Sequence, residues 1–392
     1  MRILHTSEFY PPSVGGVQEI VRRLSELLVL RGHEVTVATT RLPDRASTVS
    51  KGVAIEEFAI SGNAVRGITG EVGRYQELLV NGGFDIVMNY AAQQWATDAA
   101  FPVLDRIPSA TVLAPCGFSG LYDSAYGEYF GRLPKIMSAY DRLVVNSDQY
   151  RDAQFIRAAG LDNPVVIPNG AGTDEFGGEP STSFRRSLGI AADVPLLVTV
   201  GSHTGMKGHA ETLAAFRRAR IGPAVFVVIG NTLDGRGCST TCRARAAFTR
   251  IMSRGQKSVI LLDPPRAEVV QAFREADLFV FGSLIECSPV VLIEAAAAGT
   301  PFISGPAGNA FEIAASTGGG VIIDGSRDGR GYVHVDVRAM ALEIERLVCD
   351  VDERHRLGAA GHAAWRERFT WDRVATQWED LYSGLLRKPT RA

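Results

Sequence analysis

The segment with the strongest chemical signal runs from Glu286 to Glu294 and reads ECSPVVLIE. Ser288 belongs to a residue type that caps helices, and Pro289 is favoured in a first helical turn, so a helix should begin there. The N–H groups and the positive dipole end of a helix start attract anions. Glu294 would lie a little over one turn inside, roughly 8 Å along the axis. The segment predicts an anion site between two carboxylates, although either glutamate alone is commonly a solvated or capping residue.

The surroundings of this segment strengthen the functional interpretation. A predicted strand, Leu278–Phe281, leads into it, which places the helix start at the carboxyl edge of a sheet. Behind it, Ala295–Ala298 and then Gly299-Thr300-Pro301 form a helix body and a helix end.

A second segment, GSHTGMKG from Gly201 to Gly208, lies between a predicted strand and a predicted helix. Its small residues let the backbone approach a phosphate, and Lys207 supplies a compact positive charge. The spacing is not that of a Walker loop, in which Lys directly precedes Ser or Thr. The alternative is a surface lysine in a flexible turn.

Gly15 and Gly16 end the first loop of the chain, directly before a predicted helix. A glycine pair permits positive φ and close approach of a ligand to the backbone. An ordinary turn before a helix would give the same pattern.

The cysteines form an odd and scattered set: Cys116, Cys238, Cys242, Cys287 and Cys349. This usage is typical of reduced thiols rather than of a disulfide framework. The pair Cys238 and Cys242 could belong to a metal site, but no Cys or His partner at ligand spacing accompanies it, so we predict two free thiols and no metal. His33 and His362 are interpreted as structural or surface residues.

These segments belong to a strand–loop–helix plan that occurs twice. The first half has an amphipathic helix over Gln18–Arg31, and its strands are predicted at Arg2–Thr6, Glu34–Ala38, Ile86–Met88, Ala110–Leu113 and Arg142–Val145. The second half has a helix over His209–Arg218, and its strands are predicted at Leu196–Val200, Val225–Ile229, Val259–Leu262, Leu278–Phe281 and Pro301–Ser304. Strands separated by helices indicate parallel sheets.

The plan is interrupted at Val165–Gly170, after which a loop rich in Gly, Pro, Ser and Thr runs to about Ser183. We therefore predict an α/β protein with two Rossmann-like domains and an interdomain cleft that binds a ligand. The first domain comprises residues 1–170 with a C-terminal helix of about 371–392, and the second comprises residues 171–370.

Composition excludes some classes of protein. Lys plus Arg is 41 and Asp plus Glu is 43, giving a net charge of −2, which disfavours a nucleic-acid binder. The first residues do not resemble a secretory signal, and no apolar stretch approaches the length of a membrane span. We expect a cytoplasmic protein.

The chain resembles GT-B-fold retaining glycosyltransferases of family four, the glycosyl transferases group 1. The resemblance runs almost end to end, and its motifs are modest individually but specific jointly. They are Tyr10-Pro11-Pro12 with Gly15-Gly16-Val17, Arg31-Gly32-His33-Glu34-Val35, Ile167-Pro168-Asn169-Gly170 with Phe176, Lys207-Gly208, the Glu286–Glu294 segment and Phe369-Thr370-Trp371.

The resemblance implies a donor site for a nucleotide-diphosphate sugar, mostly on the second domain. Glu286 would be the catalytic residue, orienting the sugar hydroxyls and stabilising charge at the anomeric carbon, and Glu294 would bind the ribose hydroxyls. The diphosphate would be contacted by Lys207, by the N–H groups near Ser288, Val290 and Val291, and from the first domain by Gly16. The other donor-binding residues would be Gly15, Ser202, His203 and Pro289. Such fixed donors need no divalent ion and no other cofactor.

Two positions depart from the family pattern. An arginine that usually assists the lysine is replaced by Ser202 and His203, so either His203 substitutes for it or another cation reaches in. A histidine usual in the first domain is replaced by Cys116, which with Gly117 lies on the expected acceptor side. Cys116 is either part of the acceptor pocket or a buried thiol.

The resemblance further implies an acceptor hydroxyl on a glycan, a lipid-linked intermediate or a small molecule, with a role in surface polysaccharide, glycolipid or glycoconjugate synthesis. The alternatives are a sugar-nucleotide epimerase on the same fold and a catalytically silent nucleotide-binding protein. A segment of mixed apolar and basic residues, Tyr129–Met137, could contact the inner face of a membrane or simply pack on its own domain. Self-association into a homodimer is a further expectation.

Overall fold

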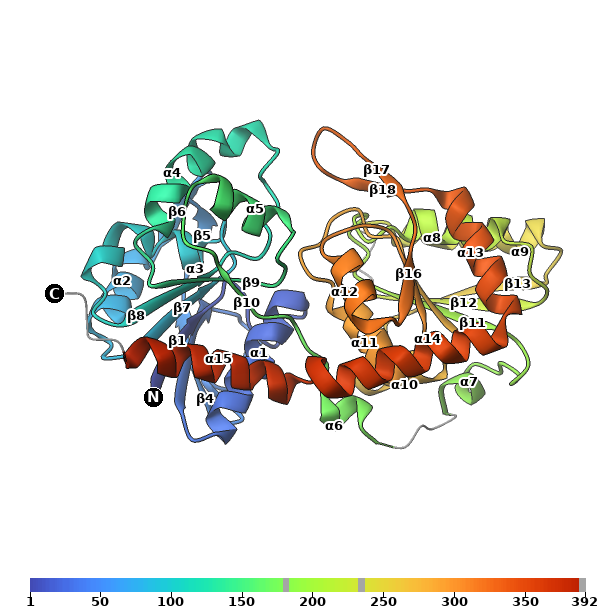
Figure 1. Ribbon diagram of the computed structural model, residues 1–392, viewed down its shortest axis with the longest axis horizontal. Coiled ribbons are helices and arrows are strands. Elements are labelled where there is room, and N and C mark those ends of the chain that lie inside the picture. Colours follow the sequence, from blue (N-terminus) through green and yellow to red (C-terminus); the bar gives the residue numbers. More distant parts are fainter. Residues whose placement is uncertain (179–182, 232–236, 388–392) are drawn as a thin grey trace. The chain divides into compact units, whose positions relative to one another are not determined.

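The computed structural model describes residues 1–178, 183–231 and 237–387 (Figure 1). The chain divides into two compact units: unit 1 is Met1–Asn169 with Trp371–Ala392, and unit 2 is Gly170–Thr370. The sequence placed the first boundary one residue later, after Gly170. Residues 179–182 of the predicted linker and 388–392 of the C-terminal segment lie outside the described residues.

Unit 1 is built on a sheet of order β10-β9-β8-β7-β1-β2-β4-β3. Its strands are β1 (Arg2–Thr6), β2 (Glu34–Thr40), β3 (Val49–Ser50), β4 (Val53–Phe58), β7 (Ile86–Tyr90), β8 (Ala110–Ala114), β9 (Arg142–Val145) and β10 (Val165–Val166). All neighbouring strands are parallel except β3 and β4. A separate hairpin consists of β5 (Ile60–Asn63) and β6 (Gly67–Gly70).

The helices of unit 1 connect these strands and pack against the sheet (Figure 1). They are α1 (Gly16–Leu30), α2 (Val72–Asn81), α3 (Trp95–Asp98), α4 (Gly127–Met137), α5 (Arg151–Ala158) and α15 (Trp371–Leu386), with 3₁₀ turns at Phe101–Arg106 and Ser124–Tyr126. The apolar side chains of α4 that could have contacted a membrane, Tyr129, Phe130, Leu133 and Met137, are buried in the core of the unit.

Unit 2 has a parallel sheet of order β13-β12-β11-β14-β15-β16. Its strands are β11 (Leu196–Val200), β12 (Ala224–Ile229), β13 (Lys257–Leu262), β14 (Leu278–Phe281), β15 (Phe302–Ser304) and β16 (Gly320–Ile322), and β17 (Gly325–Arg327) pairs with β18 (Val333–Val335) in a hairpin. The central strands are apolar along their length because helices cover both faces of a parallel sheet.

The helices of unit 2 are α6 (Thr173–Phe176), α7 (Ser183–Ser187), α8 (His209–Arg218), α9 (Ser239–Met252), α10 (Arg266–Glu275), α11 (Val290–Ala298), α12 (Ala310–Thr317), α13 (Val337–Cys349) and α14 (Val351–Ala364), followed by a π-helical turn at Trp365–Phe369. Two apolar clusters, one on each side of the sheet, form the core of this unit.

Both sheets contain the strand order 3-2-1-4-5-6 of the doubly wound fold. The order reverses between β1 and β7 in unit 1 and between β11 and β14 in unit 2. Loops at the carboxyl ends of the two strands at such a reversal border the crevice in which ligands bind.

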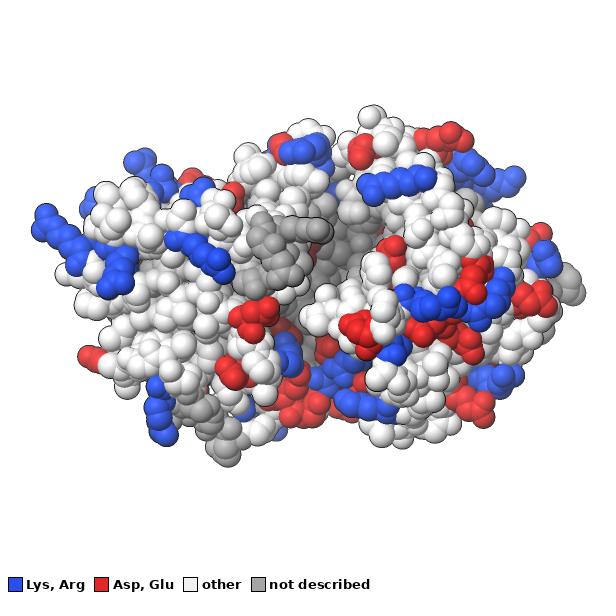
Figure 2. Space-filling model, turned by 180° about the vertical axis from the view of Figure 1, so that it is seen from behind, with Lys and Arg blue, Asp and Glu red and all other residues white. Residues whose placement is uncertain are grey.

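Charged side chains of both signs are interspersed on the face shown in Figure 2, which fits the near-zero net charge. Among the described residues, no helix is long and apolar enough to cross a membrane.

Candidate functional site

The loops that follow β11 and β14 bring the predicted donor residues of unit 2 together. Lys207 lies in the first loop, and its Nζ is 2.6 Å from Oε1 of Glu286 in the second. The Ser283 hydroxyl donates to the same carboxylate oxygen at 2.7 Å. The Glu286 side chain is only 13% exposed and that of Lys207 31%, so the pair is partly shielded from water while the lysine keeps access to solvent.

The two loops are held against each other by their backbones. The Leu284 N–H donates to the Met206 carbonyl at 2.8 Å. Gly208 has φ of 65°, and a Cβ there would overlap the carbonyl of Gly282. Glycine is therefore required at position 208 both for its dihedral and for the close approach. This contact fixes the position of Lys207 relative to Glu286.

Helix α11 starts one residue later than the sequence predicted. Pro289 is the N-cap and Val290 the first helical residue, and no side chain caps the helix, so the prediction that Ser288 caps it was wrong. Pro289 has extended backbone dihedrals (φ −69°, ψ 103°), which keep it outside the helix. The amides of Val290 and Val291 belong to the first turn, where no intrahelical acceptor exists, so they remain suited to an anion.

Glu294 lies on the second turn of α11, and its side chain is 6% exposed. Its Oε1 accepts a hydrogen bond from Nη2 of Arg266 at 2.5 Å. Arg266 also binds Glu175 through Nε and Nη2 at 2.9 and 3.0 Å. Burial opposes the charge of Arg266, but the two carboxylates hold the pKa of its guanidinium above its ordinary value. Arg266 therefore stays cationic beside the predicted ribose-binding glutamate.

Arg266 was not among the predicted site residues. It is the first residue of α10, directly after Pro264 and Pro265. A proline pair before an arginine signals a helix start, but only the fold brings that helix start to α11.

His203 does not lie beside Lys207 as a second cation. It is fully buried, and its Nδ1 is 3.5 Å from Sγ of Cys238. Burial lowers the pKa of its imidazole, so the ring is neutral at pH 7. This finding rules against His203 as the substitute for the missing arginine. Ser202, next to it, accepts a hydrogen bond from the Thr204 N–H through its carbonyl at 2.8 Å.

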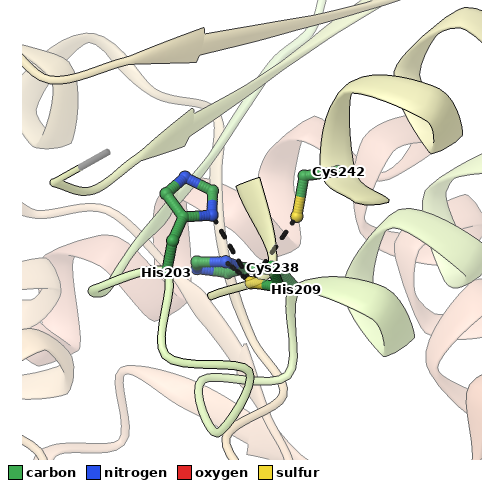
Figure 3. Close-up of side chains that lie close together, drawn as sticks. All are labelled: His203, His209, Cys238 and Cys242. Atoms are coloured by element: carbon green, nitrogen blue, oxygen red, sulfur yellow. Dashed lines mark hydrogen bonds between the residues drawn. The ribbon is translucent and has the colours of Figure 1, made fainter. Parts of the chain in front are cut away.

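His203 instead belongs to a cluster with His209, Cys238 and Cys242 (Figure 3). The interpretation that the two cysteines lack histidine partners was therefore wrong. His209 begins α8 and Cys238 is the N-cap of α9, so the four residues meet only after the second half of the chain has folded. All five cysteines of the chain are free thiols.

In unit 1, Gly15 and Gly16 form the start of α1. Gly15 is the N-cap with φ of 175°, and its carbonyl accepts from the Glu19 N–H at 3.0 Å. Gly15 is extended and neither glycine adopts the left-handed region, so the positive φ that a glycine pair permits is not used here. A Cβ on Gly16 would meet no atom within 4 Å, which leaves its backbone open to a ligand.

Cys116 and Gly117 follow β8 at the carboxyl edge of the unit 1 sheet. Cys116 (φ 58°), Gly117 (φ 87°) and Phe118 (φ 49°) are three successive residues with positive φ. Such dihedrals are costly for residues with a Cβ and concentrate at functional sites. The Gly117 N–H donates to the buried Asp152 carboxylate at 2.9 Å, which stabilises the turn. Cys116 is half-buried rather than fully enclosed.

The carboxyl ends of β1 and β7 also meet in unit 1. The Glu8 N–H donates to Oε1 of Gln94 at 3.3 Å, joining the two loops at the reversal of strand order. Burial and the nearby Asp98 raise the pKa of the Glu8 carboxyl. The sequence did not single out Glu8, although it lies in the loop that ends at Gly15 and Gly16.

Two Rossmann-like units are the components of the GT-B fold, and the second carries a lysine–glutamate pair and a helix start at its topological switch point. The family described as Glycosyl transferases group 1 matches residues 180–363, and Glycosyltransferase Family 4 matches residues 14–175. The two family models match the two halves of the chain, and the chain belongs to these glycosyltransferases.

Similar proteins are found both by sequence and by structure. A D-inositol 3-phosphate glycosyltransferase of Xylanimonas cellulosilytica is 26% identical over 100% of this chain and 98% of its own. A sucrose-phosphate synthase of Thermosynechococcus elongatus has a TM-score of 0.80 at 20% identity, covering 98% of both chains. The Anabaena protein HepE, in complex with UDP and glucose, has a TM-score of 0.75 at 16% identity, covering 98% of this chain and 100% of its own. The two solved structures indicate that this chain has the same fold as they do.

Proposed function

We propose that the protein transfers a sugar from a nucleoside diphosphate sugar to a hydroxyl acceptor with net retention of anomeric configuration. Unit 2 binds the donor and unit 1 supplies acceptor contacts. The observation that carries the proposal is the 2.6 Å pair of Lys207 and Glu286. At one switch point this site offers a cation and a helix start for the diphosphate, and a carboxylate for the sugar.

The ion pair gives this site a means of responding to its donor. A diphosphate carries more charge than one carboxylate, so Lys207 exchanges Glu286 for the diphosphate when the donor binds. Glu286 is then released to accept hydrogen bonds from the sugar hydroxyls and to face the positive charge that develops at the anomeric carbon. The exchange couples donor binding to activation of the catalytic carboxylate.

The amides of Val290 and Val291, with Lys207, stabilise the diphosphate as it leaves. Fixed donors at the position of developing charge cost no reorganisation during the reaction. We therefore propose that transfer proceeds without a divalent ion. Glu294 keeps one oxygen on Arg266 and binds the ribose hydroxyls with the rest of its carboxylate.

We propose that retention arises from attack on the face from which the diphosphate leaves, without a covalent glycosyl-enzyme intermediate. The bond between the anomeric carbon and the phosphate oxygen breaks as the acceptor oxygen bonds to that carbon. The acceptor proton passes to the departing phosphate oxygen, so no protein base is needed.

The substrates are proposed from what similar proteins are named for. HepE is described with UDP and glucose, and the curated relatives act on D-inositol 3-phosphate. A UDP-hexose and a small phosphorylated polyol are therefore the first pair to test. A lipid-linked glycan, as in surface polysaccharide or glycolipid synthesis, is the second acceptor class, and the cytoplasm is the proposed compartment for both.

The first experiment measures thermal shifts of the purified protein with UDP, GDP, ADP and their sugar conjugates, with EDTA present. The matching nucleotide should raise the midpoint of unfolding, because it binds the native state. Lys207→Ala and Glu294→Ala should abolish the rise, and exposed Lys135→Ala should preserve it.

The second experiment determines the product of the matched donor with each acceptor by NMR. A product with the anomeric configuration of the donor supports the proposal, and an inverted product overturns retention. Loss of turnover in EDTA that Mg²⁺ or Mn²⁺ restores and Zn²⁺ does not would overturn transfer without a divalent ion. A sugar nucleotide altered at a ring carbon with no acceptor consumed would indicate an epimerase. Nucleotide binding without turnover of any acceptor would indicate a catalytically silent protein.

A further inference from the structure

We propose that His203, His209, Cys238 and Cys242 form a structural zinc site in unit 2 (Figure 3). Their ligand atoms all lie within 4.8 Å of one another. His203 and Cys238 come from loops, His209 from the start of α8 and Cys242 from the first turn of α9. The inference is independent of the proposed sugar transfer.

Three of the six distances between ligand atoms of the cluster match those between the ligands of one tetrahedral ion. With zinc–sulfur bonds of about 2.3 Å and zinc–nitrogen bonds of about 2.0–2.1 Å, a tetrahedron separates two sulfurs by about 3.8 Å and sulfur from nitrogen by about 3.5 Å. The two Sγ atoms are 3.8 Å apart. Sγ of Cys238 is 3.5 Å from Nδ1 of His203 and 3.6 Å from Nδ1 of His209.

The contacts of the cluster converge on one sulfur, because Sγ of Cys238 lies close to two imidazole nitrogens and a second thiol. Neutral groups can satisfy these contacts only through weak hydrogen bonds of sulfur, which donates one proton and accepts others. Two neutral imidazoles and two thiolates would instead place four lone pairs around a divalent cation with a net charge of zero, which a buried site tolerates.

Burial of the site also fits a structural rather than a catalytic ion. His203, His209 and Cys242 are 0%, 2% and 1% exposed, and Cys238 is half-buried. Four protein ligands leave no open position for water or substrate, which is the pattern of structural zinc. A mixed sulfur and nitrogen set favours zinc over magnesium or calcium, which prefer oxygen.

The site would fix the loop that carries Lys207. Two of its ligands flank this lysine, His203 four residues before it and His209 two residues after it. The Cys238 N–H donates to the His203 carbonyl at 2.9 Å, so the backbone already joins the loop to α9. A bound ion would hold both ends of the Lys207 loop on α9 without touching the donor.

The test measures metal in the full-length protein purified without a histidine tag and under reducing conditions. We expect one zinc per chain, and we expect Cys242→Ser and His209→Ala to lose it. The matched controls replace residues of the same type elsewhere, exposed Cys349→Ser and exposed His355→Ala, and should keep the zinc. Equal zinc content in Cys242→Ser and in the unmodified chain would overturn the proposal.

A second measurement covers variants that fail to fold. Unmodified protein stripped with a chelator is titrated with Co²⁺, then with Zn²⁺. We expect a thiolate-to-cobalt charge-transfer band and strong tetrahedral visible bands that saturate at one equivalent and disappear with zinc. Zinc should also raise the unfolding midpoint of the stripped protein. No such bands, or a disulfide between Cys238 and Cys242 in the reduced preparation, would show that the cluster binds no metal.

Discussion

At the scale of single residues, the position of a charge matters more than its presence. Lys207 pairs with Glu286, and Arg266 pairs with Glu294, so the two predicted glutamates of the donor site each have a cation. In the unliganded chain both carboxylates are therefore stabilised although both are largely buried. Substitution of one partner should therefore show how much each charge contributes to kcat and to kcat/KM.

Lys207→Ala should lower kcat/KM by about 10²–10³-fold, because one preorganised donor to the leaving diphosphate is lost. Glu286→Gln should lower kcat by a similar factor and leave the donor KM nearly unchanged, because Lys207 is then free for the diphosphate. Steady-state kinetics with varied donor measures both effects, with Lys135→Ala as the control. A variant Lys207→Ala that keeps full kcat/KM would contradict the assigned role.

Asp98 provides a prediction about pH. It is buried, and desolvation raises the pKa of its carboxyl from 3.8 to about 6, despite hydrogen bonds from the Ala64 N–H and the Tyr129 hydroxyl, both at 2.9 Å. The folded state therefore binds the proton more tightly than the unfolded state does. Below pH 4 both states are protonated, and stability is lost as the pH rises from about 4 to about 6.

Asp98→Asn removes this pH-dependent loss. Relative to the unmodified protein, its free energy of unfolding should increase by up to about 3 kcal/mol between pH 4 and pH 7, beyond any constant offset from the changed hydrogen bonds. Denaturant titrations at several pH values measure the difference, and Asp105→Asn at an exposed position is the control. A difference that does not change with pH would show that Asp98 ionises normally in the folded protein.

The sequence points to candidate site residues where a short local segment carries the signal. Lys207, Glu286 and Glu294 stand in short segments that join a strand to a helix, and the fold brings the first two together. Arg266 and the histidine partners of Cys238 could not be found in this way, because their contacts join elements far apart in the chain. His203 was assigned to the donor site because it lies near Lys207 in the sequence. Its complete burial instead places it away from the donor.

At the scale of elements, several strands and helices have the predicted bounds, among them β1, β9, β11, β14 and α8. The apolar runs and the periodicity of their own residues are sufficient to predict these elements. The sequence missed β4, the β5–β6 and β17–β18 hairpins and the edge strand β16, which are short or mixed in polarity and depend on pairing with a neighbour. The late start of α11 shows the same limit, since Pro289 and Ser288 both carry helix-start signals.

Gly208→Ala tests the contact between the loops after β11 and β14. The Cβ of an alanine at position 208 would overlap the Gly282 carbonyl. The alanine backbone would also have to adopt φ of 65°. We expect a loss of stability at least about 2 kcal/mol larger than that of Gly205→Ala, because overpacking adds to the dihedral cost. Gly205 has φ of 83° but no atom within 4 Å of its Cβ position, so it isolates the dihedral term.

Chemical unfolding of both variants measures the difference, and donor affinity provides a second readout. Gly208→Ala should also weaken donor binding, because the loop that positions Lys207 at the donor site would be shifted. Equal stability losses in the two variants would mean that the loops can separate without cost.

At the scale of the whole molecule, unit 1 depends on the end of the chain. After unit 2 the chain returns to unit 1 as α15, which packs on α1 and buries Trp371, Trp378 and Tyr382. The Tyr382 hydroxyl is 3.1 Å from Nε2 of His5 in the central strand β1. His5 is fully buried, and burial lowers its pKa to about 3, so its ring is neutral.

Tyr382→Phe should destabilise unit 1 and leave unit 2 unaffected. The neutral ring of His5 keeps its bond between Nδ1 and the Ser25 hydroxyl at 2.8 Å, but Nε2 loses its partner in a fully buried site. An unsatisfied buried polar atom costs about 1–3 kcal/mol. Hydrogen exchange should therefore show faster opening of β1 and α1, with exposed Tyr122→Phe as the control. Equal changes in β11 and β14 would show that the two units open together, whereas protection lost only in β1 and α1 would show that α15 stabilises unit 1 separately.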